Sequence, residues 1–368
     1  MRTTVWEAAN QLGVVAGTPG ELLTALLSAP RRPRHVTLPA DAPDAAALAG
    51  DLRALGDVHV TFARPPDAPP VAPATALDLS DPALVCAADP VRVTGAYEEG
   101  GEHGGLRAAW FRAGQVLVRA GQTPEARALA LLAALPEDAE PRLRPGLAEL
   151  AAGTPWEVIA TRAGHASALA VCDGRFMVEE DPKVRALACP GDGTRLHLDE
   201  RGHLHVRDGS PSRLARAVAA TLATHPATAL AALGDMVVTG DRMGSVHAFS
   251  LAGVHQAAPH SGRVTALAAA PGPRCYSGGV DGTVRTWRPG GTPSGTPLTR
   301  RPYPVVALHA GAGVLAVAWA DGLAELHQLG TGESRAFRPG PAVRAVAVGP
   351  DGTLAVATPE SLVHLRPR

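Results

Sequence analysis

Histidines are the first candidates for metal binding or proton transfer in this sequence. Three of the 14 histidines lie within the segment RLHLDERGHLHV, at His197, His203 and His205. The segment predicts a hairpin, and alternate residues of a strand share a face, so His203 and His205 could chelate one ion. A four-residue DERG loop would place His197 opposite Leu204, on the other face. We therefore interpret all three as strand-surface residues and predict no metal site.

Other catalytic arrangements are incomplete. Lys183 is the only lysine, and it stands in an Asp-Pro-Lys turn with no glycine-rich loop before it. A phosphate-binding or Schiff-base lysine is therefore not expected. The sequence has neither the Gly-x-Ser-x-Gly elbow of hydrolases nor a His-Glu-x-x-His motif. We predict a protein without enzymatic activity and without a cofactor.

The cysteines and the N-terminus indicate a compartment. Four cysteines are too widely spaced for a Cys-x-x-Cys pair: Cys86, Cys172, Cys189 and Cys275. This spacing favours reduced thiols over a disulfide framework or a zinc knuckle. The first residues, MRTTVWEAANQLG, lack the pattern of a signal peptide, and no run of apolar residues is long enough to span a membrane. We predict a cytoplasmic protein.

The charge balance excludes two classes of partner. The net charge is -1, so no cationic excess exists to neutralise nucleic acid or an anionic membrane surface. Arginine supplies every basic side chain except Lys183, and alanine, glycine and proline are abundant. This composition is typical of a high-GC genome, and we expect an actinobacterial source.

The second half of the chain repeats with a period of about 40 residues. Each unit reads as a short apolar strand, a turn, a small-residue strand, a glycine turn and an alternating strand. Such punctuation is typical of antiparallel β-structure, and the period is that of a propeller blade. The units begin near Lys183, Ala227, Arg263, Pro304 and Ala342.

One unit is the most complete. It has His260 before its first strand, Ser277 in the second, Asp281 in an Asp-Gly turn and Trp287 at the end of the third. With these residues the repeat resembles a WD-repeat β-propeller. The resemblance implies that the four side chains form a buried hydrogen-bonded network within one blade. The preceding unit keeps the pattern in part, at His225, Thr239, Asp241 and Phe249.

The expected fold is mainly β, with a propeller of six or seven blades over residues 154–368. Five blades follow from the units after Lys183, and the strand-like runs between Trp156 and Asp181 indicate a sixth or part of one. The final blade ends on LVHLR and needs an outer strand from elsewhere in the chain. We assign that strand to Trp156–Thr161 or to a segment further upstream.

The first half of the chain lacks the repeat. Residues 1–63 predict a small α/β region, with helices over 20–30 and 43–55 and strands over 35–38 and 57–63. The two strands and the helix between them form one βαβ unit. Residues 64–80 predict a Pro-rich linker, and residues 81–153 predict a helical region with three helices after residue 105.

The stretch VVAGTPGELLTALL, residues 14–27, has the strand, glycine loop and helix order of a P-loop. It resembles a degenerate nucleotide-binding module of signal-transduction NTPases. Glu21 replaces the lysine, and no acid follows Val36–Leu38 to hold Mg²⁺. A carboxylate would repel phosphates, so nucleotide binding does not carry over. The alternatives are an inactive NTPase relic and a plain α/β appendage.

Arginines recur in the loops and strand ends of several repeats, and radial repetition would bring some onto one face. Guanidinium groups suit carboxylate-rich partner proteins, and aromatic side chains often anchor interfaces. Tyr303 and Trp319 fit a core role equally well. The predicted partner-binding residues are Arg242, Arg263, Tyr303, Trp319 and Arg344.

These observations favour a non-catalytic scaffold or regulatory subunit that assembles other proteins. One alternative is a propeller enzyme or small-ligand binder that works at the central channel. A second alternative is an inactive, NTPase-derived regulator. No oligomeric state is predicted.

Overall fold

The computed structural model describes residues 2–63 and 77–368. It divides the chain into two compact units. The first holds the residues up to Thr161 together with 338–342 and Arg368, and the second holds 162–337 and 343–367. Most of the predicted Pro-rich linker, residues 64–76, lies outside the described residues.

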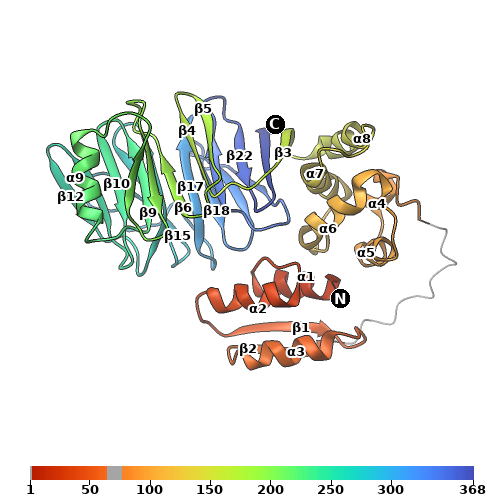
Figure 1. The fold of residues 1–368 in the computed structure, drawn as a ribbon. Helices are drawn as coiled ribbons and strands as arrows, with labels where there is room; N and C mark the ends of the chain where they lie inside the picture. The colour runs from red at the N-terminus through yellow and green to blue at the C-terminus, as the bar shows by residue number, and fades with distance from the viewer. Residues whose placement is uncertain (1, 64–76) are drawn as a thin grey trace. The chain divides into compact units, whose positions relative to one another are not determined.

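A short parallel sheet organises the first 63 residues (Figure 1). Its strands pair in register with His35 opposite His59, and the helix between them completes the expected βαβ unit. Alternate residues of both strands, such as Val36 and Val60, are buried against the helices. The elements are α1 (Arg2–Leu12), α2 (Pro19–Ser28), β1 (Arg34–Pro39), α3 (Ala45–Ala54) and β2 (Val58–Ala63).

Five α-helices follow in the same unit, two more than expected. Those beginning at Pro82, Pro90 and Pro124 each have proline in the first turn and an Asp or Thr N-cap, which is a strong start signal. Trp110 is fully buried, and its indole N–H donates to Thr94 at 2.9 Å. The helices are α4 (Pro82–Ala87), α5 (Pro90–Glu98), α6 (Leu106–Leu117), α7 (Pro124–Ala134) and α8 (Leu143–Leu150), with short 3₁₀ turns at His103–Gly105 and Ala151–Gly153.

The segment compared with a P-loop has a different structure. Residues 14–16 form no strand; the side chain of Gln115 holds them by donating to the Val14 carbonyl and accepting from the Ala16 N–H. The Glu21 carboxylate accepts the Gly17 N–H at 2.7 Å. A P-loop uses such N–H groups to cradle phosphate, whereas here side chains of the protein occupy them. The expected strand, glycine loop and helix order is therefore wrong for this segment.

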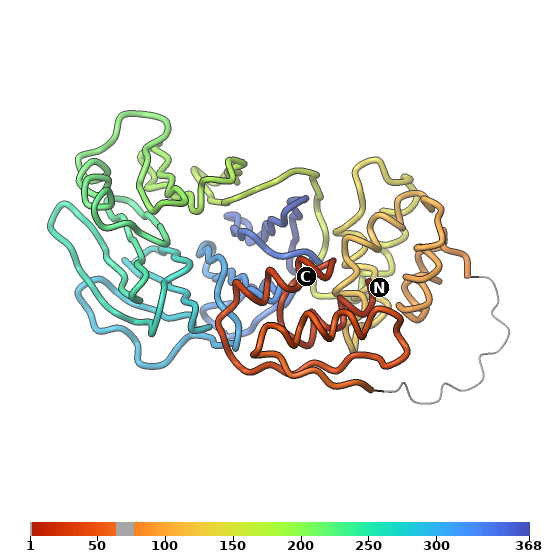
Figure 2. Tube along the Cα trace, turned by 60° about the horizontal axis from the view of Figure 1, so that its bottom comes forward, coloured from red at the N-terminus to blue at the C-terminus, as the bar shows by residue number. Residues whose placement is uncertain are grey.

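After the helices come six sheets whose first strands follow one another in chain order, and the chain colour in Figure 2 follows them toward blue at the C-terminus. The first two sheets pair β4 (Ala168–Cys172) with β5 (Arg175–Glu179), and β6 (Val184–Ala188) with β7 (Arg195–Asp199) and β8 (Leu204–Arg207). The next two are β9 (Ala229–Leu233), β10 (Met236–Gly240), β11 (Val246–Ser250) and β12 (Gly253–Ala257), and β13 (Val264–Ala270), β14 (Arg274–Gly279), β15 (Thr283–Trp287) and β16 (Thr299–Arg300). The last are β17 (Val305–Gly311), β18 (Val314–Trp319), β19 (Ala324–Gln328) and β20 (Ser334–Phe337), and β21 (Ala345–Val348), β22 (Leu354–Ala357) and β23 (Ser361–Pro367) with β3 (Trp156–Ala163).

The first strands of these sheets contact one another in the closed order β4, β6, β9, β13, β17, β21 and back to β4. This closed ring makes the fold a β-propeller. Five of its sheets have three or four strands and count as blades, whereas β4 and β5 form only a two-stranded hairpin in the ring. The expectation of six or seven blades is wrong: the hairpin fills a position in the ring without building a full blade.

The final blade closes as the sequence predicts. Its sheet has the order β21–β22–β23–β3, so its outer strand comes from residues 156–163, before the first blade.

The sheet of β6 has three strands, and a helix lies at its outer edge. Helix α9 (Arg213–Leu222) contacts β8, and its apolar face joins a core cluster with Leu196, Leu204 and Val237. The helix therefore lies at the blade edge where the next blade has its fourth strand, β12.

His260, Ser277 and Asp281 form the network that the WD-repeat resemblance implies. His260 lies 2.8 Å from the Ser277 hydroxyl through Nε2 and 3.1 Å from the Asp281 carboxylate through Nδ1. Thr283 adds a hydroxyl that donates to Asp281 at 2.8 Å. Burial alone would raise the pKa of Asp281, but hydrogen bonds from His260 and Thr283 and the His260 charge lower it overall.

Trp287 does not join that network. Its indole N–H donates to the Gly291 carbonyl at 2.9 Å, four residues along its own chain. The preceding blade also differs from the expected pattern, because the His225 side chain is exposed and its ring lies 2.9 Å from the hydroxyl of the neighbouring Thr224. Asp241 instead pairs with His247 at 3.3 Å. One blade thus has the expected network for the histidine, the serine and the aspartate, but not for the tryptophan.

Glycines in the turns between second and third strands pack against the chain entering the next blade. Gly282 has φ +70°, and a β-carbon there would lie 2.0 Å from the Arg301 carbonyl oxygen. Gly244 has φ +98° and the same relation to the His260 carbonyl. Only glycine combines this backbone conformation with so close an approach.

Within the described residues, no helix is long and apolar enough to cross a membrane.

Candidate functional site

The inner strands of the propeller surround a cavity of about 360 Å³, here called the channel. All six inner strands contribute to its wall. Equivalent residues of neighbouring inner strands lie at the same depth along the channel. Thr228 donates to the Val264 carbonyl and Thr265 to the Val305 carbonyl, both at 2.6 Å, and these bonds fix that alignment. The repeat therefore stacks chemically similar residues into rings around the channel.

The channel wall changes from polar to apolar along its length. At the end where the inner strands begin, the mouth ring consists of Ser167, Arg185, Thr228, Thr265, Val306 and Arg344. Next comes a ring of six alanines, one from each inner strand. The leucine ring follows, with Leu169, Leu187, Leu230, Leu267, Leu308 and Val346. A charged rim thus stands directly above two rings of apolar side chains.

Arg185 and Arg344 carry the charge of the mouth ring. Both are exposed, and neither side chain forms an ion pair or hydrogen bond with any residue that the structure describes. Ser167 lies between them in the ring order β21, β4, β6, with its hydroxyl 3.0 Å from the Glu179 carbonyl. The described wall of the channel contains no Asp, Glu or Lys side chain. The two guanidinium groups are therefore not neutralised from within the wall.

His309 is the one histidine in the described channel wall. Its Nδ1 accepts the Val348 N–H at 3.1 Å, so the neutral ring carries its proton on Nε2 and can donate there. Burial lowers the pKa of His309 to about 4. The ring is consequently neutral near pH 7.

We expect His309 to make the protein less stable in acid. The unfolded chain takes up a proton on this residue as pH falls through about 6.5, whereas the folded protein does so only near pH 4. Stability is therefore lost between these values, by roughly 2–3 kcal/mol at pH 4.5. Urea unfolding at pH 7 and pH 4.5 measures this, with His309→Gln as the comparison. An equal loss of stability in both proteins would contradict the assignment.

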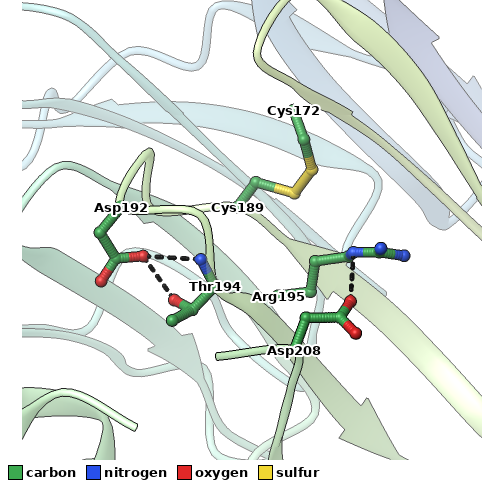
Figure 3. The surroundings of a disulfide bond; sticks show 6 residues. All are labelled: Cys172, Cys189, Asp192, Thr194, Arg195 and Asp208. Atoms are coloured by element: carbon green, nitrogen blue, oxygen red, sulfur yellow. Dashed lines mark hydrogen bonds and ion pairs between the residues drawn. A yellow bond between two sulfur atoms is a disulfide. The ribbon is translucent and has the colours of Figure 1, made fainter. Parts of the chain in front are cut away.

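A disulfide joins Cys172, at the end of β4, to Cys189, just after β6 (Figure 3). It links two neighbouring inner strands at the end of the channel opposite the mouth ring, and Cys189 lines the cavity. The expectation of four reduced thiols is wrong for this pair: wide spacing in sequence does not prevent adjacent blades from bringing cysteines together. Only Cys86 and Cys275 remain as free thiols, and both are buried.

The structure separates the predicted partner-binding residues into three groups. Arg344 belongs to the mouth ring. Arg242 and Arg263 are exposed outside the channel, in the β10–β11 turn and directly before β13. Trp319 is fully buried and donates its indole N–H to Glu325 at 2.7 Å, so it offers no surface to a partner. Tyr303 is half-buried, with the Arg301 guanidinium 5.5 Å from its ring centre.

Arg185 is a channel residue that was not selected from the sequence. The signal was available, since the units KVRALACPG and AVRAVAVGP place an arginine at the same position of the repeat. Those two arginines, Arg185 and Arg344, flank the hairpin of β4 and β5 in the ring. Their equivalence becomes meaningful only once the ring closes, because closure brings the first and last repeats together.

The histidine hairpin has a different register from the expected one. His197 lies opposite His205, and Leu198 lies opposite Leu204, so the two histidines share a face. They do not form a common site. His197 is buried with Nδ1 3.2 Å from Glu179, whereas His205 pairs with Asp199 at 2.8 Å. The described residues hold no group of three or more His, Cys, Asp or Glu arranged to bind a metal.

Among solved structures that this chain resembles are three distant ones. The computationally designed protein Ika8 is 20% identical over 55% of this chain and 71% of its own, with a TM-score of 0.37. U3-55K is 13% identical over 55% and 81%, and the WD40 repeats of RRP9 are 14% identical over 55% and 80%, both with a TM-score of 0.39. No protein-family model and no curated protein matches the sequence. Scores this low carry no argument about family or function, so the propeller is defined here by its own strand pairing.

Proposed function

We propose that the protein is a non-catalytic scaffold that binds a partner protein through the docking patch, defined as Arg242, Met243 and Arg263. The observation that carries this proposal is the joint exposure of these three residues on two segments that a backbone hydrogen bond joins. Met243 is 81% exposed. The Val264 N–H donates to the Asp241 carbonyl at 2.9 Å, which holds the turn with Arg242 beside the segment with Arg263.

The docking patch carries two guanidinium charges, and Asp241, the carboxylate of the same turn, bonds to its own turn and to His247. Asp241 accepts hydrogen bonds from the Met243 and Ser245 N–H groups and pairs with His247. Arg242 and Arg263 form no side-chain contact of this kind within the described ranges. An exposed methionine between two arginines fits a partner segment with carboxylates around an apolar side chain.

The test is recovery of partners from the native host with the full chain as bait, followed by mass spectrometry. Arg242→Glu with Arg263→Glu is expected to abolish recovery of the specific partner, because charge reversal repels the same carboxylates. Arg216→Glu is the control, since it reverses an equally exposed arginine on α9. Equal recovery by both variants would contradict the docking patch.

The remaining parts of this proposal come from the sequence. They are the lack of enzymatic activity, the cytoplasmic location and protein partners in place of nucleic acid or membrane. A substrate turned over by the purified protein, with activity lost on replacing one channel residue, would replace the scaffold with a propeller enzyme.

A further inference from the structure

The channel combines two exposed arginines at its mouth with apolar side chains below them, and none of these residues belongs to the docking patch. Its mouth ring and its leucine ring are separated by a single ring of alanines, so charge and apolar surface lie within the reach of one small molecule. The cavity of about 360 Å³ lies at the small end of the range found for ligand pockets. We propose that the channel binds a small carboxylate with an apolar body, its head at the mouth ring and its body against the leucine ring.

The head group follows from Arg185 and Arg344. Both guanidinium groups are without a partner among the described residues, and the wall has no carboxylate to compensate them. Guanidinium binds carboxylate through two parallel hydrogen bonds, which combine charge with a planar fit. Ser167 lies between the two arginines in the ring, but its hydroxyl donates to the Glu179 carbonyl, so the two guanidinium groups are the donors that remain for the head group.

The two threonines of the mouth ring have no free hydroxyl proton to offer the head group. The hydroxyls of Thr228 and Thr265 donate to the carbonyls of Val264 and Val305, each on the next inner strand. These bonds join neighbouring blades. The ring is therefore asymmetric: its hydroxyl groups donate to backbone carbonyls, whereas the guanidinium groups of Arg185 and Arg344 remain available to a ligand.

The apolar body follows from the wall beneath the mouth ring. The alanine and leucine side chains offer no hydrogen bond, so the side-chain surface at this depth favours an apolar body, although the inner strands also present open backbone edges. An apolar body gains from leaving water. His309 is the exception in the described wall, and its neutral Nε2–H can donate one hydrogen bond to a ligand.

The experiment uses the full chain and isothermal titration calorimetry with sodium hexanoate as probe. Acetate lacks the apolar body, and 1-hexanol lacks the charge. Hexanoate is expected to bind at least about ten-fold more tightly than either. Comparable binding of acetate, or of 1-hexanol, would overturn the corresponding half of the proposal, and no binding of hexanoate or of the peptide described below would overturn it entirely.

Variants locate the site. Arg185→Gln and Arg344→Gln are each expected to weaken hexanoate binding about ten-fold. Arg242→Gln changes an exposed arginine outside the channel and is expected to leave the affinity unchanged. Because the two arginines are exposed, thermal unfolding of each variant should match the parent and so confirm folding. Undiminished binding by Arg185→Gln with Arg344→Gln combined would contradict the assignment.

A carboxylate of this kind could be a free molecule or the C-terminus of a protein that ends in an apolar residue. A pentapeptide ending in leucine, and the same peptide as its C-terminal amide, distinguish the two sources. Tighter binding of the peptide acid than of hexanoate, with loss in the amide, would identify a chain terminus. Equal or tighter binding of hexanoate would identify a free ligand. Partner recovery that depends on Arg242 and Arg263 is read separately, so the two proposals can fail independently.

Discussion

Replacing Asp281 with alanine is expected to lower the free energy of unfolding by about 3–5 kcal/mol. The His260 side chain is fully buried, and its Nδ1 has the Asp281 carboxylate and the Thr283 hydroxyl as its polar neighbours. Removing the carboxylate leaves buried donors without a partner, which costs more than the lost bond itself. Urea unfolding monitored by circular dichroism measures the change.

The chain supplies a matched control for this prediction. Asp351 stands in the same Asp-Gly-Thr sequence and accepts the same two bonds from Thr353, but no histidine reaches it. Asp351→Ala is therefore expected to cost only about 1 kcal/mol, the usual net value of such bonds. Similar losses for both variants would show that the turn, and not the His260 network, carries the stability.

Breaking the disulfide is expected to have the second-largest effect. Cys172→Ser with Cys189→Ser should cost about 3 kcal/mol, because the bond closes a loop of 17 residues in the unfolded chain. The native state adds a local reason. β4 and β5 form the thinnest sheet of the ring, so the link to β6 secures its least supported position. Thermal unfolding of the parent and the double variant measures the loss.

A reductant gives an independent form of the same test. It should lower the melting temperature of the parent protein but leave that of the double variant unchanged. The other thiols do not interfere, since burial raises the pKa of Cys86 to about 12 and that of Cys275 to about 11. Cys275→Ser serves as the control. A melting temperature insensitive to reductant in the parent would argue against a stabilising disulfide.

The sequence predicts the propeller from periodicity, and this prediction is sound because blades depend on repeated turns. Strand pairs such as β14 and β15 follow from alternation around Asp281-Gly282. The closing strand could also be predicted, since a chain that ends in a strand must cover its last edge. These features are set by local chemistry and by the need to satisfy backbone hydrogen bonds.

Features that depend on contacts between blades could not be predicted in the same way. The repeat pattern does not predict helix α9, although Leu214, Val218 and Leu222 recur at helical spacing, because the helix lies between two repeat units. The blade count was too high because strand-like runs around Trp156 and Asp181 do not reveal which sheet each one joins. Tertiary pairing decided both cases.

The candidate site shows the same division. Arg344 was selected from the sequence for its charge, but its role at the mouth ring depends on Arg185, which is remote in the chain and near in the ring. Trp319 was selected as an aromatic, and burial beside Glu325 removes it from any surface. Residue type suggests what a side chain can bind, whereas the fold determines which side chains lie together and which are exposed.

The closing strand has a consequence for how the protein is made. β3 is synthesised before every blade, yet it belongs beside β23, the last propeller strand to leave the ribosome. The edge of β3 that pairs with β23 therefore stays unpaired while roughly 200 intervening residues are translated, at about 5–20 residues per second. For tens of seconds the nascent chain carries an incomplete ring with two open sheet edges. Long-range pairing of this kind slows folding, and it makes chaperone protection during translation valuable.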